Sequence, residues 1–175
     1  MFQKILVAID LSTMARQVFD EALALARWSN GSLMLLHVLS NEEEVSPALP
    51  IYAVASYPYA LNLDNYPTPL DLDMFREQWK TYEQKGLELL KIFTDEAMTA
   101  GVKAEFTQDQ GSPSRMICNL ARTWEADHIV MGRRGHSGLN EMFLGSVSNY
   151  VLHHAVCSVL TVQTPVAPNA QVVEH

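Results

Sequence analysis

Cysteine is scarce in this chain, which has only Cys118 and Cys157 among its 175 residues. Two cysteines, each within an apolar stretch, cannot form a disulfide-rich scaffold, so we expect both thiols to pack in a core and the protein to reside in a reducing cytoplasm. No apolar run approaches the roughly 18–20 residues that span a bilayer. The N-terminal apolar run stops at Asp10 and is too short for the core of a signal peptide.

Positive charge is also in short supply, with 12 Lys and Arg against 20 Asp and Glu and a net charge of −8. A general nucleic-acid binder needs a basic face, so this composition argues against that class. Residues 41–73 contain six of the acids and no Lys or Arg, which leaves 14 acids against 12 bases in the remainder. The net charge is therefore concentrated in one segment, and the rest of the chain is nearly neutral.

Short apolar runs alternate with longer helical patterns along the chain. Residues 4–9 are apolar at nearly every position, as in a strand buried on both faces, whereas residues 102–107 alternate apolar and polar side chains as an edge strand does. Three further runs have the composition of strands, at residues 32–38, 128–131 and 158–162. Helical patterns separate the five runs, at about residues 14–30, 75–101, 113–124 and 146–154.

This alternation predicts an α/β fold with a mainly parallel sheet of five strands and helices on both faces. We expect one domain over residues 1–165, followed by a flexible tail at 166–175. Sheets of this kind bind ligands beyond the carboxyl ends of their strands, where the strand order reverses. The residues that follow Ile9, Val38 and Met131 are therefore the first candidates for a binding site.

Periodicity disappears over residues 41–69, which contain five prolines and four tyrosines. Loops of this length are usually lids, binding loops or disordered segments, so we interpret the stretch as an insertion. The sequence leaves open whether it is a lid, a dimer contact or disordered. The acidic triplet at residues 42–44 is expected to be a solvated part of it.

A glycine-rich loop follows the fourth predicted strand. Gly132 and Gly135 allow a sharp turn whose N–H groups can approach an anion, and Gly145 then opens a helix whose dipole favours phosphate. The hydroxyls of Ser146 and Ser148 could donate further hydrogen bonds. Positive charge nearby comes from Arg133, Arg134 and His136. The pattern indicates a site for a phosphate chain.

The spacing Gly-x2-Gly-x9-Gly-Ser in this loop resembles the ATP-binding signature of the universal stress protein family. The opening Lys-Ile-Leu-Val-Ala-Ile-Asp, the Leu-Leu-His-Val run and the final Ser-Val-Leu-Thr-Val run fit the same family. The resemblance covers residues 1–40 and 70–163. Neither the Walker pattern nor the dinucleotide fingerprint is present.

The resemblance implies an adenine nucleotide alpha hydrolase-like fold with strand order 3-2-1-4-5, ATP as the ligand with or without Mg²⁺, and a homodimer through the last strand. Asp10 would lie near the ribose, Ala8 near the adenine, and the backbone of Val38 would read the adenine edge. Arg133 and Arg134 vary in the family, so their assignment to the site is based on charge alone. The ribose and phosphate contacts would be Met131, Gly132, Gly135, Gly145, Ser146, Val147 and Ser148. The dimer edge would be Val159, Leu160, Thr161 and Val162.

Simpler readings stay open beside these. Asp10 could cap a turn or the first helix, and Arg133 and Arg134 could be a solvated pair. His37 is expected to be a core histidine with satisfied hydrogen bonds. The histidines at 153 and 154 are expected to interact with the dipole at a helix C-terminus and not to bind a metal.

The main functional hypothesis is a nucleotide-responsive homodimeric module that binds ATP and an unidentified protein partner. The alternatives are a slow ATP hydrolase or phosphoryl-transfer enzyme, a dimeric interaction module without nucleotide, and a redox flavoprotein on fold grounds alone. No catalytic or metal-binding residue is predicted.

Overall fold

The computed structural model describes residues 2–43, 45–47, 69–133 and 145–163. Within these ranges the predicted alternation of strands and helices is confirmed. The elements in chain order are β1 (Lys4–Ala8), α1 (Ala15–Ser29), β2 (Ser32–Leu39), α3 (Pro69–Thr99), β3 (Lys103–Gln110), α4 (Pro113–Thr123), β4 (His128–Gly132), α5 (Ser146–His154) and β5 (Ser158–Val162). Residues 44 and 48–68 of the predicted insertion at 41–69 and the whole predicted tail at 166–175 lie outside the described residues.

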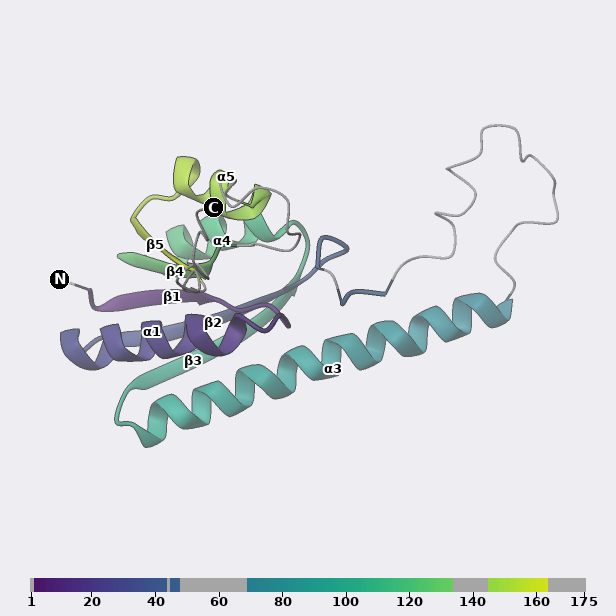
Figure 1. Cartoon of the computed structure of the whole chain (residues 1–175), viewed down its shortest axis with the longest axis horizontal. Helices are drawn as coiled ribbons and strands as arrows, with labels where there is room; N and C mark the ends of the chain where they lie inside the picture. The colour runs from purple at the N-terminus through teal and green to yellow at the C-terminus, as the bar shows by residue number, and fades with distance from the viewer. Residues whose placement is uncertain (1, 44, 48–68, 134–144, 164–175) are drawn as a thin grey trace, which may run out of the picture.

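The five strands form one sheet of order β3-β2-β1-β4-β5, and every neighbouring pair is parallel (Figure 1). The strand order and the edge position of β3 are as predicted. Ala8 at the end of β1 is in register with Leu36 of β2 and with Met131 of β4. The order reverses between β1 and β4, so the carboxyl ends of these two strands mark the switch point.

Two hydrophobic cores lie on the two faces of the sheet, and residues of β1 alternate between them. Val7 belongs to the core with Phe19 of α1 and Phe93 of α3, whereas Leu6 belongs to the core with Val151 of α5. Figure 1 accordingly shows α1 and α3 on one face and α4 and α5 on the other. The continuous apolar run of β1 is explained by this burial on both sides.

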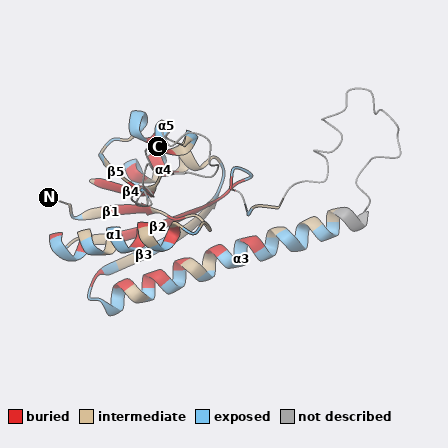
Figure 2. Ribbon diagram, viewed as in Figure 1, coloured by how far each residue is buried: buried red, intermediate tan, exposed pale blue. Residues whose placement is uncertain are grey.

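Helix α3 is the longest element and extends well beyond the sheet at its N-terminal end (Figure 1). Buried residues recur along the part that lies on the sheet, including Leu90, Phe93 and Ala97, while exposed residues dominate elsewhere (Figure 2). Among the described residues, none of the helices is both long enough and apolar enough to cross a membrane.

Close contact between α3 and the sheet requires a glycine in the middle of the helix. A Cβ atom added at Gly86 would lie 2.3 Å from His37 Nδ1 and 2.4 Å from Gln108 Nε2. His37 is 1% exposed, and its ring is held by hydrogen bonds on both nitrogens, so it cannot move aside easily. A helical glycine costs about 1 kcal/mol relative to alanine, and here the close approach of the helix to the sheet offsets that cost.

We predict that Gly86→Ala destabilises the protein by about 1–3 kcal/mol, the usual cost of overpacking, although alanine is the better helix former. Urea unfolding followed by circular dichroism measures the change. The control is Lys85→Ala at an exposed neighbouring position, which should change the free energy of unfolding by less than about 0.5 kcal/mol. An unchanged or raised stability of Gly86→Ala would contradict the close contact.

His128 at the start of β4 is a buried histidine that the sequence did not single out. Its ring packs against Phe2 with a centroid distance of 4.6 Å, and its buried Nδ1 atom has no hydrogen-bond partner among the residues that the structure describes. Burial lowers the pKa of His128 by disfavouring the imidazolium, although the charge of Asp127 acts in the opposite direction. The folded state therefore favours the neutral ring.

We predict that acid destabilises the protein through His128. The unfolded chain takes up a proton at this ring below pH of about 6.5 while the folded state resists it, so stability falls as the pH drops from that value toward the lowered folded-state pKa. His128→Phe should flatten this part of the profile in urea unfolding at pH 7.5, 6.5 and 5.5, whereas the exposed His153→Gln should keep the wild-type slope. Equal slopes for His128→Phe and wild type would refute the assignment.

Candidate functional site

The turn after β1 holds Asp10 at the switch point. Ile9 N–H donates to the Leu36 carbonyl at 2.8 Å and extends the pairing with β2, and the chain then turns. Asp10 Oδ1 accepts hydrogen bonds from Ser12 N–H at 3.2 Å and from Ser12 Oγ at 2.5 Å. This oxygen stabilises the turn, as one reading of the sequence anticipated. The other oxygen, Oδ2, has no donor among the described residues, so the half-buried carboxylate retains one acceptor for a ligand.

The end of β4 lies beside this turn. A Cβ atom at Gly132 would meet Val18 Cγ2 at 3.4 Å and Met14 Cβ at 4.0 Å, which are ordinary contacts, so packing among the described residues does not require a glycine here. Arg133 is not a freely solvated cation. Its N–H donates to the Val162 carbonyl at 2.8 Å, and its guanidinium donates to Gln163 Oε1 at 2.8 Å. The predicted residues Arg134 and Gly135 lie outside the described part of the chain.

No described residue supplies a side-chain cap at the start of helix α5. Gly145 is its N-cap, with φ −58° and ψ 154°, and the first turn contains no acidic residue. The first N–H groups of a helix have no intrahelical acceptor, so, within the described part of the chain, this terminus keeps donors for an anion. Ser146 is exposed at the first helical position. Ser148 is buried and donates its hydroxyl to the Gly145 carbonyl at 3.0 Å, so that proton is already used within the helix.

The parallel sheet brings these groups to one edge. Because β4 and β5 are parallel, α5 must run back across the sheet between them, and its N-terminus lies at the carboxyl edge. Val38 is near the end of β2, two residues beyond the partner of Ala8. The described candidates therefore gather at the switch point: Ala8, Asp10, Val38, Met131, Gly132, Arg133, Gly145, Ser146, Val147 and Ser148.

A buried polar cluster next to this edge was missed from the sequence. The expectation that residues 42–44 are solvated is wrong for Glu43, which is 8% exposed. Glu43 Oε1 accepts the Leu11 N–H at 2.5 Å, and Oε2 accepts hydrogen bonds from the Tyr82 hydroxyl and from His37 Nε2, the latter at 3.2 Å. The expectation that His37 is a core histidine with satisfied hydrogen bonds is confirmed.

Electrostatics of the cluster follow from its burial and its donors. Burial alone would raise the pKa of Glu43, but hydrogen bonds from His37, Tyr82 and the Leu11 backbone together outweigh it, so the pKa is lowered and Glu43 is ionised. Burial and the hydrogen bond to Glu43 raise the pKa of the Tyr82 hydroxyl, which stays protonated. An acidic triplet gives no sign of which member is buried. The only sequence signal was a glycine one turn after Tyr82 in a long helix.

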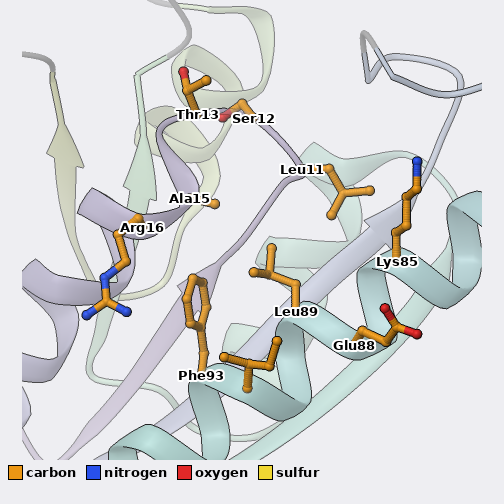
Figure 3. A pocket seen from close by; sticks show the side chains of 10 residues that line it. Leu11, Ser12, Thr13, Ala15, Arg16, Lys85, Glu88, Leu89 and Phe93 are labelled. Atoms are coloured by element: carbon orange, nitrogen blue, oxygen red, sulfur yellow. The ribbon is translucent and has the colours of Figure 1, made fainter.

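An open groove of about 540 Å³ runs beside the Asp10 turn, between the start of α1 and the middle of α3 (Figure 3). Its walls are largely apolar, with Leu11 and Ala15 facing Leu89 and Phe93, and Lys85 lies at its rim. None of the residues predicted from the sequence to bind nucleotide lines this groove. The groove is therefore a neighbour of the candidate site and not the site itself.

Comparison with known proteins gives a consistent family. The model of the universal stress protein family matches residues 1–163. Universal stress protein Sll1388 of Synechocystis sp. is 34% identical over 163 residues, which cover 93% of this chain and 98% of that protein.

Two solved structures share the fold. Universal stress protein UspA from Lactobacillus plantarum superposes with a TM-score of 0.67 at 23% identity, covering 92% of this chain and 97% of that one. A universal stress protein family protein from Arabidopsis thaliana, solved with AMP bound, has a TM-score of 0.58 at 25% identity, covering 92% of this chain and 91% of that one. With the family match over residues 1–163 and the 34% identity to the Synechocystis protein, this chain belongs to the universal stress protein family.

Proposed function

We propose that this protein is an ATP-binding module whose site is the carboxyl edge of β1 and β4. The observation that carries the proposal is the uncapped N-terminus of α5, placed by the parallel crossover at the same edge as the open carboxylate oxygen of Asp10. N–H donors for a phosphate and a carboxylate oxygen that accepts from a hydroxyl, at the same edge of the sheet, are what a nucleoside phosphate requires. The AMP found in the Arabidopsis family member supports an adenine nucleotide as the class of ligand.

Each part of the nucleotide has a proposed partner. Asp10 Oδ2 would accept a hydrogen bond from a ribose hydroxyl. Ala8 and Met131, adjacent across β1 and β4, would support the base and sugar, and the backbone of Val38 would read the adenine edge. The phosphates would lie at Gly132 and at the first turn of α5. Arg134 and Gly135 complete this proposed set, and a Mg²⁺ ion accompanying ATP is part of it.

Assembly is the second part of the proposal. Strand β5 is the last strand of the sheet, and Leu160 on it is 38% exposed. An edge strand with unpaired backbone groups is a template for a second strand. We propose a homodimer through Val159, Leu160, Thr161 and Val162, acting on an unidentified protein partner. The thiols of Cys118 and Cys157 are free, which supports a cytoplasmic location.

The nucleotide proposal is tested by identifying what the protein carries and binds. Protein purified without added nucleotide is denatured, and the released small molecules are identified by chromatography and mass spectrometry. Calorimetric titration with ATP, AMP and cyclic AMP, with and without Mg²⁺, then measures affinity. Absence of binding in every titration overturns the proposal. Production of ADP in proportion to protein concentration would establish the hydrolase instead.

We predict that Ser146→Asp lowers ATP affinity by at least about tenfold, since a carboxylate would occupy the position proposed for phosphate. The same change should leave thermal stability unchanged or slightly raised, because an acid at a helix N-terminus stabilises the helix. Asn119→Asp adds the same charge at an exposed position of α4 and should bind ATP as the wild type does. Wild-type ATP affinity in Ser146→Asp would place the phosphates elsewhere.

A further inference from the structure

We propose that Glu43 is a positioning residue for ribose recognition, acting from the α3 side through the backbone of the Asp10 turn. The inference depends on the proposed function, because Asp10 can accept a hydrogen bond from a ribose hydroxyl only if the protein binds a nucleotide. Glu43 belongs to the segment after β2, and its carboxylate bonds the N–H of Leu11, the residue next to Asp10.

Three hydrogen bonds to two carboxylates hold the backbone from Asp10 to Ser12. Asp10 Oδ1 accepts from Ser12 N–H and Oγ, and Glu43 Oε1 accepts from Leu11 N–H. Consecutive backbone N–H groups are thus bound to two different carboxylates. With both held, the turn has one conformation, and the remaining Asp10 oxygen is presented without a rearrangement when ligand binds. Such preorganisation raises affinity by reducing the ordering cost of binding.

Glu43 is itself held rigidly. Gln108 Nε2 lies 3.1 Å from the Glu83 carbonyl and 2.9 Å from His37 Nδ1, so its amide group donates to both. His37 Nδ1 is therefore an acceptor, and the Nε2–H of the ring donates to Glu43 Oε2. The same oxygen accepts the Tyr82 hydroxyl, whose ring in turn contacts Trp79 at a centroid distance of 5.5 Å.

The chemistry of these partners explains why residue 43 is a carboxylate. A buried charge is costly unless hydrogen bonds satisfy it, and Glu43 receives three of them. A glutamine would offer one carbonyl oxygen in place of two and would direct its own N–H₂ group toward at least one of the three donors. An ionised carboxylate is therefore the side chain that can bond Leu11, His37 and Tyr82 together.

The expected signature is a loss of discrimination for ribose hydroxyls. Wild-type protein should bind ATP more tightly than 2′,3′-dideoxy-ATP, because Asp10 needs a hydroxyl to accept from. The measured quantity is the ratio of the affinity for ATP to the affinity for dideoxy-ATP, and Asp10→Asn should reduce this ratio. Glu43→Gln should weaken ATP binding by about tenfold while barely affecting dideoxy-ATP, so its ratio also falls toward one. In Asp10→Asn, adding Glu43→Gln should lower the ratio no further, since both changes remove the same interaction.

The control is Glu96→Gln, the same substitution at a surface carboxylate of α3. Glu96 pairs with Arg16 at 2.7 Å on each oxygen, and within the described residues its carboxylate has no hydrogen bond to the Asp10 turn. The Glu96→Gln variant should keep the wild-type ratio of ATP affinity to dideoxy-ATP affinity. Calorimetry is done at a temperature where circular dichroism shows each variant folded, which separates positioning from stability. If Glu43→Gln does not fold, Tyr82→Phe removes one of the three donors and is judged by the same ratio.

The outcomes separate the two proposals. Wild-type discrimination that is retained in Glu43→Gln, or in Tyr82→Phe where that variant carries the test, overturns the positioning role and leaves nucleotide binding intact. Wild-type protein that binds no adenine nucleotide overturns both. Parallel loss of affinity for ATP and dideoxy-ATP would show that the cluster supports only the fold, and it also overturns the inference.

Discussion

Parallel pairing of all five strands is the constraint on which the rest of the structure depends. It sends every carboxyl end to one edge of the sheet, so turns that are far apart in the sequence converge there. It also requires each connection to cross a face, which covers β1 on both sides and accounts for its unbroken apolar run. The positions of Asp10, Gly132 and the start of α5 all follow from this geometry.

The position of α3 is set by polar as well as apolar contacts. Leu90 and Phe93 pack in the core, but Tyr82 and Gly86 meet the sheet at a buried carboxylate and an imidazole. Apolar packing alone permits small shifts of a helix along a sheet, whereas a hydrogen-bonded cluster has one arrangement that satisfies its donors. This cluster therefore fixes where along its length α3 contacts the turn after β1.

Much of the fold could be predicted from the sequence because the signals were local. The apolar run at residues 4–9 and the alternation at 102–107 indicate burial directly, and Gly145 before Ser146 indicates the start of a helix. Burial of Glu43 could not be predicted in this way. It depends on donors at positions 37 and 82, which only the tertiary structure brings together, and a glutamate with two acidic neighbours has the pattern of a solvated loop.

The bond between Leu11 N–H and Glu43 makes one loop amide part of a larger cooperative unit. Amide protons in surface loops usually exchange with solvent through small local fluctuations. Here the amide is bonded to a buried carboxylate that Tyr82 of α3 also bonds, so opening of the amide is coupled to the contact of α3 with the sheet. The turn after β1 should therefore share the opening free energy of the longest helix, although it contains no regular secondary structure.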